Sequence, residues 1–182
     1  MHRRQLLGMF AAGSAVTLAG AWWALPGAPA AGPISMVGAQ QLLQQLSGKT
    51  LESVEGWSPA EVFNHCAQSV DYSMDGYPQL KPAWFRHSIG PLAFDAFAAR
   101  GGMRHPLREA IPGAPALLVP AETQGALQRL QVSMQRFVEH AGALQPHFAY
   151  GELSHAEYAV AHVLHLYNDL GLIRPALSCG CV

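Results

Sequence analysis

The chain has 182 residues and a formal net charge of -1 at neutral pH, with 13% charged and 50% hydrophobic residues. This length suits one domain preceded by a targeting segment, and the apolar content is sufficient for a hydrophobic core. The 11 lysines and arginines are scattered along the chain. This excludes nucleic acid as a partner, because proteins that bind it gather cations to displace counterions from phosphate.

The first 30 residues have the organisation of a twin-arginine export signal. Arg3 and Arg4 stand directly before an uncharged stretch at positions 6–25, and small residues at 28–30 provide a cleavage site. A charged start, an apolar middle and a small-residue exit are typical of a signal peptide, and paired arginines indicate the twin-arginine route. We therefore expect the twin-arginine translocation machinery to export the protein to the periplasm or the medium. An uncleaved membrane anchor is the alternative, because about 20 uncharged residues can span a bilayer.

Two helices are predicted in the first half of the remaining chain. Residues 31–37 are interpreted as a linker, and the apolar spacing within residues 38–46 predicts the first helix. The second helix has a distinct start, because Ser58 and Glu61 form a capping box around a proline at the first helical position. Apolar residues then recur at intervals of three and four until Gly76, where we expect the helix to end.

The middle of the chain is less regular. Residues 81–100 predict one or two short helices, interrupted near Gly90. Residues 101–120 are rich in proline and glycine and predict a loop, because proline cannot continue a helix. A third long helix is predicted over residues 121–141, where apolar side chains again follow helical spacing.

The fourth long helix begins at a second capping box, which starts at Ser154, and runs through Asp169 with Gly171 as its C-terminal cap. No segment alternates convincingly between apolar and polar residues as a strand does. These elements predict an all-α domain, a four-helix bundle over residues 38–174, followed by a cysteine-containing tail at 175–182.

Histidines on two of these helices are candidate metal ligands. His162 and His165 are three residues apart on the fourth helix, and Asp169 follows one turn later. If the second helix faces the fourth, His65 joins them, and bundles build metal sites in this way from inward-facing side chains. Zinc, nickel or iron would accept these ligands. The alternative is that these histidines are buried and satisfied by hydrogen bonds. Three others are interpreted as surface or loop residues: His87, His105 and His155.

The three cysteines outside the signal do not form a disulfide scaffold, because their number is odd. Cys66 lies inside the second helix, where a free cysteine usually serves as a small hydrophobic residue rather than as a catalytic thiol. Cys179 and Cys181 near the C-terminus could bind a soft ion such as copper(I). An exposed reactive tail is the simpler interpretation of that pair.

The run from Phe63 to Ser73, followed by Gly76-Tyr77-Pro78, resembles the second-helix signature of an uncharacterised branch of the DinB/YfiT-like superfamily. The similarity continues at residues 111–115, 147–154 and 162–165. Members of that superfamily are four-helix bundles, and many bind a divalent metal through one histidine of the second helix and two of the fourth. Some transfer groups to a low-molecular-weight thiol. The resemblance implies His65 as the second-helix ligand and His162 as the first ligand of the fourth helix.

This chain departs from the superfamily pattern at Leu166, where the second fourth-helix histidine usually stands, and it keeps His165 instead. Two functions follow from the resemblance. One is metal-dependent group transfer or hydrolysis that uses a thiol or water. The other is a non-enzymatic module that binds a small ligand or a partner through a degenerate site. The oligomeric state is left open, with a dimer among the options. For the second function we expect a groove lined by Tyr72, Tyr77, Trp84 and Tyr158.

Overall fold

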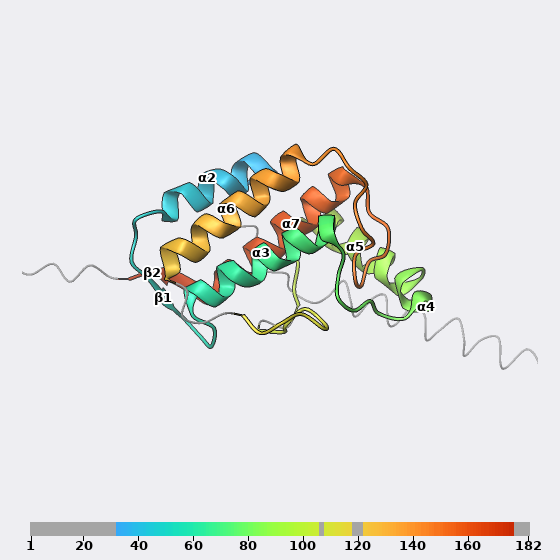
Figure 1. Cartoon of the computed structure of the whole chain (residues 1–182), viewed down its shortest axis with the longest axis horizontal. Coiled ribbons are helices and arrows are strands. Elements are labelled where there is room, and N and C mark those ends of the chain that lie inside the picture. Colours follow the sequence, from blue (N-terminus) through green and yellow to red (C-terminus); the bar gives the residue numbers. More distant parts are fainter. Residues whose placement is uncertain (1–31, 106–107, 118–121, 177–182) are drawn as a thin grey trace, which may run out of the picture.

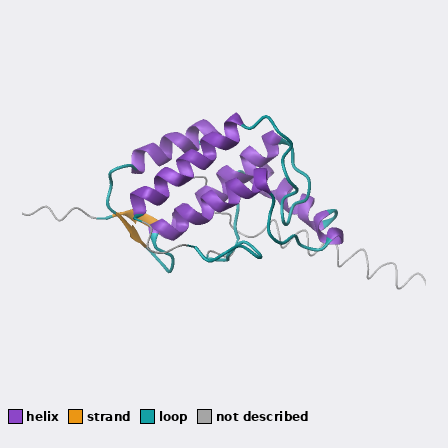
Figure 2. Ribbon diagram, in the orientation of Figure 1, coloured by secondary structure: helices purple, strands orange, loops and turns teal. Residues whose placement is uncertain are grey.

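The computed structural model describes residues 32–105, 108–117 and 122–176. The predicted signal and the tail cysteines Cys179 and Cys181 lie outside these ranges. The described part of the chain is mostly helical with one small two-stranded sheet, as Figure 2 shows, so the prediction of a helical fold is confirmed in outline. None of the helices in these ranges combines the length and the hydropathy required to span a bilayer.

Four long helices pack on one another in the described structure. They are α2 (Met36–Leu46), α3 (Pro59–Asp75), α6 (Thr123–Glu139) and α7 (His155–Asp169). Helix α3 packs against α6 and α7, and α2 contacts the same two helices (Figure 1). The shorter elements are β1 (Leu51–Ser53), α4 (Ala83–Arg86), α5 (Ile89–Arg100), the 3₁₀ helix η1 (Leu170–Leu172) and β2 (Ile173–Pro175).

The starts of the long helices follow their capping residues. Helices α3 and α7 begin directly after Ser58 and Ser154, and both predicted capping boxes are present. Helix α2 begins at Met36, earlier than predicted, because the side chain of Ser35 accepts the backbone N–H of Gly38 at 3.1 Å. The predicted linker is correspondingly shorter.

Two predicted boundaries are wrong. The interruption between α4 and α5 precedes Gly90, which lies in the first turn of α5 together with Pro91. Proline is tolerated there, because the first N–H groups of a helix have no intrahelical acceptor. Gly171 does not cap α7, since the C-cap is Leu170 and the chain continues into η1.

The two-stranded sheet was not predicted. Strand β1 pairs antiparallel with β2, with Leu51 opposite Pro175 and Ser53 opposite Ile173. Each strand has three residues, which is too short for an alternating pattern to be recognised. The pairing joins the connection between α2 and α3 to the segment after α7, at one end of the helices (Figure 1).

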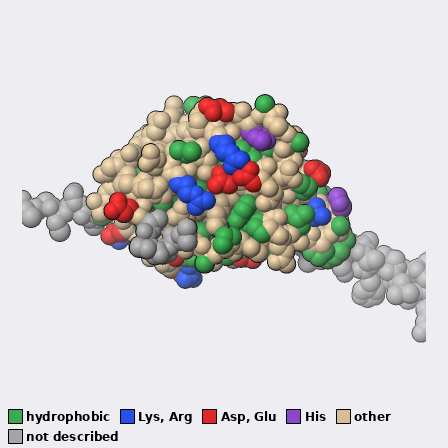
Figure 3. Space-filling model, viewed as in Figure 1, with side chains coloured by type: hydrophobic (Ala, Val, Ile, Leu, Met, Phe, Trp, Pro, Cys, Tyr) green, Lys and Arg blue, Asp and Glu red, His purple; other side chains and the backbone are tan. Residues whose placement is uncertain are grey.

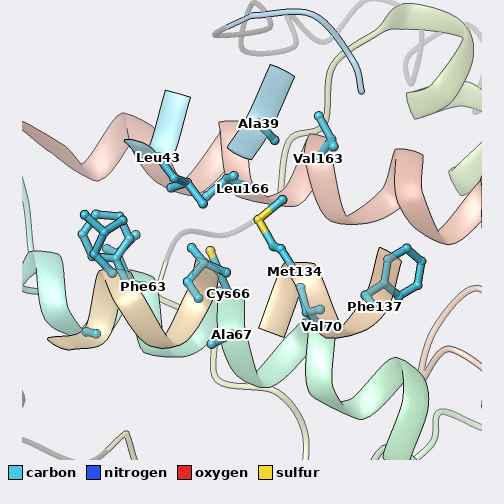
Figure 4. Packing of buried hydrophobic residues seen from close by; sticks show 14 of the residues in the cluster. Ala39, Leu43, Phe63, Cys66, Ala67, Val70, Met134, Phe137, Val163 and Leu166 are labelled. Atoms are coloured by element: carbon cyan, nitrogen blue, oxygen red, sulfur yellow. The ribbon is translucent and has the colours of Figure 1, made fainter. Parts of the chain in front are cut away.

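Leu166 of α7 belongs to the hydrophobic core. It is 2% exposed, and Figure 4 shows its side chain beside Leu43 of α2, on the side of α7 that faces the other long helices. Met134 of α6 and Cys66 of α3 contribute to the same cluster. The position that the superfamily pattern gives to a ligand is therefore occupied by a core residue in this chain.

Ion pairs connect α3 and α6 on the outside of the molecule. Arg136 binds Asp75, with Nη1 2.8 Å from Oδ2, and Arg129 donates to Asn64 at 2.9 Å and contacts Asp71. On the face in Figure 3, basic and acidic side chains lie next to one another and do not gather into a patch of one sign.

Helix α5 packs closely on the turn that precedes α7. A Cβ atom at Gly90 would overlap the carbonyl oxygen of Ala149. Within that turn, His147 donates its N–H to the carbonyl of Gly151 at 2.7 Å, and Gly151 has a φ of 81°, which favours glycine. The turn and the first residues of α5 are thus held in one arrangement.

The Gly90 contact predicts a stability difference between two glycine-to-alanine variants. Gly90→Ala should lower the free energy of unfolding by about 1–3 kcal/mol, since the added methyl group forces packed backbone apart. Gly125→Ala is the control, because Gly125 lies in α6 with open space around it. It should raise stability by about 0.5–1 kcal/mol through helix propensity. Urea denaturation measures both, and equal changes would contradict the packing argument.

Candidate metal centre

Helices α3 and α7 bring His65, His165 and Asp169 together. Nε2 of His65 lies 3.1 Å from Nε2 of His165, which lies 3.1 Å from Oδ2 of Asp169. The third side, from Nε2 of His65 to Oδ2 of Asp169, is 3.7 Å. Among the described residues, this is the group whose histidine, cysteine and acidic ligand atoms are close enough to hold one metal ion.

The two groups from α7 are one helical turn apart. His165 and Asp169 are separated by four residues, so their side chains lie above one another on the helix face that meets α3. Leu166 is adjacent to His165 in sequence but points into the core. Helix α7 therefore has two candidate ligands four residues apart, His165 and Asp169, and the second of them is a carboxylate.

His162 lies outside this group and has other partners. Its Nε2 is 3.1 Å from the hydroxyl oxygen of Ser73, which itself donates to the carbonyl of Val70. That hydroxyl therefore accepts the Nε2–H of His162, and the nitrogen has no lone pair for a metal. Burial, and then the neighbouring His165, lowers the pKa of His162 to about 3. In this position His162 is a neutral, hydrogen-bonded histidine.

The carboxylate of Asp169 is fully enclosed, with 1% exposure. Burial alone raises the pKa of Asp169, but His165 and His105 outweigh this effect and hold it below its ordinary value. Asn168 donates to Oδ1 at 3.1 Å. Within the described ranges, the ion-pair partners of Asp169 are histidines, with no lysine or arginine among them. An ionised carboxylate in such surroundings is strongly stabilised by a cation.

His105 lies in a loop, as the sequence predicts, and this loop places it beside the centre. Its Nε2 lies 3.2 Å from Oδ1 of Asp169, and its ring meets the edge of the His165 ring at 4.9 Å between centroids. The loop between α5 and α6 brings it there. Such a loop has no periodicity, so no signal in the sequence placed His105 beside α7.

The two ligand imidazoles differ in the hydrogen bonding of their Nδ1 atoms. Nδ1 of His165 lies 3.2 Å from the hydroxyl of Ser69, which fixes the ring and turns Nε2 toward His65. Nδ1 of His65 is buried and has no hydrogen-bond partner among the described residues. Burial, and then His165, lowers the pKa of His65 to about 3, so its ring is neutral at physiological pH.

A cavity of about 260 Å³ opens beside the centre, with both ligand imidazoles in its wall. Most of the remaining wall is apolar, formed by Phe85, Phe97, Met103, Ile111, Phe148 and Tyr150. Lys81, Arg104 and Glu109 also line it, and their side chains are exposed. The cavity is close to the lower end of the range, about 300–1,000 Å³, that is typical of small-molecule sites.

The groove expected from the sequence does not coincide with this cavity. None of its four predicted residues lines the cavity. Tyr158 is fully buried, and its hydroxyl donates to the carbonyl of Gln145 at 2.7 Å. Trp84 is 66% exposed on α4. The prediction of those lining residues is wrong, because the cavity is lined instead by other residues of α3, α4, α5 and α7 together with the loop before α6 and the turn before α7.

Comparison with known families assigns the chain. A family model described as "protein of unknown function (DUF1569)" matches residues 36–176. The chain belongs to the DUF1569 family. The matched region begins with α2, ends after β2, and contains every residue of the candidate metal centre. No curated protein and no solved structure matches this DUF1569 chain.

Cys66 of this DUF1569 protein is next to the centre but is not poised as a nucleophile. Its side chain is buried, and Sγ donates to Oδ2 of Asp169 at a distance of 3.7 Å. Burial, and then the Asp169 charge, raises the pKa of Cys66 well above its ordinary value. Because the thiolate is the reactive form, this residue is expected to be inert in the folded protein.

The burial of Cys66 predicts its alkylation behaviour. In a variant with Cys179→Ser and Cys181→Ser, iodoacetamide should leave Cys66 unmodified while the protein is folded and should react fully in denaturant. Mass spectrometry measures both reactions. Fast alkylation of the folded protein at neutral pH would show that this side chain is accessible and ionised.

Proposed function

We propose that this DUF1569 protein is a DinB-like four-helix bundle that binds a divalent metal ion through His65, His165 and Asp169. The ion would serve in hydrolysis or group transfer on a small molecule held in the adjacent cavity. The observation that carries this proposal is the convergence of two imidazole nitrogens and a carboxylate oxygen at the cavity wall. These three residues come from α3 and α7, the helices that the resemblance to the superfamily also implicates.

The separations between the ligand atoms fit a metal ion. With metal–ligand bonds of about 2.0–2.2 Å, neighbouring ligand atoms lie about 3–3.5 Å apart in tetrahedral or octahedral geometry. Two of the three separations are 3.1 Å and the third is 3.7 Å. Three protein ligands leave positions open, as in catalytic centres, and this donor set suits zinc, nickel or iron.

The charges favour a cation as well. Asp169 is enclosed and ionised, while His65 is neutral and its Nε2 faces the carboxylate. A buried anion without a compensating charge is costly, whereas a divalent ion is neutralised in part by this carboxylate and accepts the imidazole lone pair.

Neighbouring groups support the ligands. The hydroxyl of Ser69 holds His165 through Nδ1, and Asn168 holds Oδ1 of Asp169, so that Oδ2 remains directed at the proposed ion. Second contacts of this kind orient ligands and raise metal affinity. Loss of the Ser69 contact would allow the His165 ring to rotate away from the ion.

The cavity limits the chemistry to small molecules. Its apolar walls would bind the apolar part of a substrate and displace water from it. When bound, the ion would lower the pKa of a water or thiol and polarise an oxygen of the substrate. Cys66 takes no part in this scheme, because its thiol is buried and protonated.

Metal content tests the ligand assignment. The full-length protein supplied with zinc should retain about one ion per chain after desalting, as expected for a centre with three protein ligands. His65→Ala, His165→Ala and Asp169→Asn should each lose nearly all of it, since each removes one of the ligand atoms. His162→Ala is the matched control from the same helix and should retain the metal. Elemental analysis by mass spectrometry provides the measurement.

Two outcomes of that experiment would contradict the assignment. Negligible metal in the wild type would exclude the centre. If His162→Ala loses the metal while its unfolding midpoint equals that of the wild type, then His162 is a ligand, as the sequence predicted and against the geometry.

A non-enzymatic ligand-binding module is the second candidate. The apolar cavity favours it, and so does Nδ1 of His65, which lacks the hydrogen bond that metal-bound histidines usually make. In that case a ligand of the cavity would bind equally well before and after treatment with a chelator. The metal proposal requires that treatment with a chelator changes the affinity of the cavity for that ligand.

Export through the twin-arginine route is proposed from Arg3 and Arg4. Replacing both by lysine should leave the full-length chain inside the cell, because this machinery distinguishes arginine from lysine despite their equal charge. Fractionation with detection of the chain measures the result. Recovery of the wild type at its full mass in the membrane fraction would favour the uncleaved anchor.

A further inference from the structure

His147 is a further polar residue in the wall of the cavity, contributed by the turn before α7. It is 7% exposed. The main chain holds it in place, because His147 and Gly151 exchange backbone hydrogen bonds of 2.7 and 3.2 Å. Its ring stacks on Tyr150, with 4.3 Å between centroids and 8° between planes, and meets the edge of Tyr77 on another side.

The hydrogen bonds of the ring determine where its proton lies. Nδ1 of His147 accepts the backbone N–H of Ala149 and that of Tyr150, both at 3.1 Å. A ring nitrogen that accepts hydrogen bonds has no proton, so the proton of the neutral ring is on Nε2. A second proton on Nδ1 would break both bonds. Burial, and then His162, also lowers the pKa of His147 well below its ordinary value.

The Nε2–H group is left without a partner in the protein. Among the described residues, none accepts a hydrogen bond from it, and the atom is not completely enclosed. Because His147 is one of the residues that line the cavity, we infer that the accessible side of this N–H group faces it. Native structures rarely leave a donor this deeply placed without an acceptor, and the acceptor here would be a molecule in the cavity.

We propose that the Nε2–H group of His147 donates a hydrogen bond to a carbonyl or carboxylate oxygen of the small molecule that the cavity binds. The ligand class is thus a compound with an apolar body, which suits the walls, and one oxygen acceptor. An ammonium group in the same place would present hydrogen to hydrogen and be rejected. This inference deepens the proposed function and rests on it for the ion, but the donor itself does not depend on the metal.

The neutral state of the ring defines what His147 can do. It provides a donor that does not change charge across the physiological range, so it orients the ligand oxygen without supplying a proton from an imidazolium. A donor fixed in advance binds more strongly to an oxygen that becomes negative, because no reorganisation is required. His147 is thus a ligand-binding group on the cavity wall, apart from the three metal ligands.

The tautomer can be measured without any assay of activity. In full-length protein labelled with ¹⁵N-histidine, long-range ¹H–¹⁵N spectra distinguish protonated from unprotonated ring nitrogens. We expect His147 to show a protonated Nε2 and an unprotonated Nδ1 from about pH 5 to pH 8, the range in which an ordinary histidine titrates. Benzoate, a small aromatic carboxylate, should shift the Nε2–H signal, whereas benzylammonium should not.

Two substitutions separate the donor from its structural role. In His147→Asn the side-chain oxygen can replace Nδ1 as the acceptor of the two backbone N–H groups, but the Nε2–H donor is lost. In His147→Gln an amide nitrogen takes the place of Nε2. The asparagine variant should bind benzoate about tenfold more weakly, as expected for a lost hydrogen bond to a charged group, and glutamine should restore part of the affinity. Calorimetry measures binding, and circular dichroism verifies folding.

The outcomes distinguish this inference from the metal proposal. Each measurement is made on chelated and on zinc-loaded protein. A protonated Nε2 that benzoate shifts in the chelated protein supports the donor even if no metal binds. A protonated Nδ1, titration of the ring near pH 6.5, or equal benzoate affinity in wild type and His147→Asn would overturn it. If the asparagine variant does not fold, the wild-type spectra alone decide.

Discussion

The contact between α3 and α7 at Asp169 is the interaction on which the described site depends. An ionised carboxylate in the interior is tolerated only where polar groups surround it, and His65, His165 and Asn168 provide them. These groups come from two helices that are about a hundred positions apart in the chain. The register of α7 against α3 is therefore tied to the position of one buried charge. Leu166, adjacent to His165, fixes the same register from a neighbouring side of the helix by packing into the core.

Polar and apolar requirements meet again in the cavity. Its apolar wall comes from α4, α5, the loop after α5 and the turn before α7, whereas its metal-facing side comes from α3 and α7. The two long helices provide the ligands, and the other segments shape the cavity. The close contact of Gly90 with Ala149 connects α5 to the turn that carries His147, so the apolar wall and the proposed donor are built on the same packed unit.

The elements that the sequence predicts well are those with strong local signals. Ser58 and Ser154 mark helix starts through capping boxes, which are contained within four residues. Helical spacing also indicates His162, His165 and Asp169 as candidates, and the expected facing of the second helix adds His65. The place of His105 could not be predicted, since it depends on how a loop without periodicity folds over α7. The separation of His162 from the ligand group depends on a hydrogen bond to Ser73 across two helices, which spacing along one helix does not contain.

The small sheet of β1 and β2 has a consequence for the end of α7. Asp169 is the last residue of that helix, where backbone hydrogen bonds are the first to fray. Strand β2 follows after one turn of η1 and is anchored to β1, with Arg174 binding Glu52 at 2.7 Å. The sheet thus acts as a clamp on the terminal turn that carries the carboxylate. Amide hydrogen exchange in this turn would therefore report on the integrity of a strand pair that does not line the cavity.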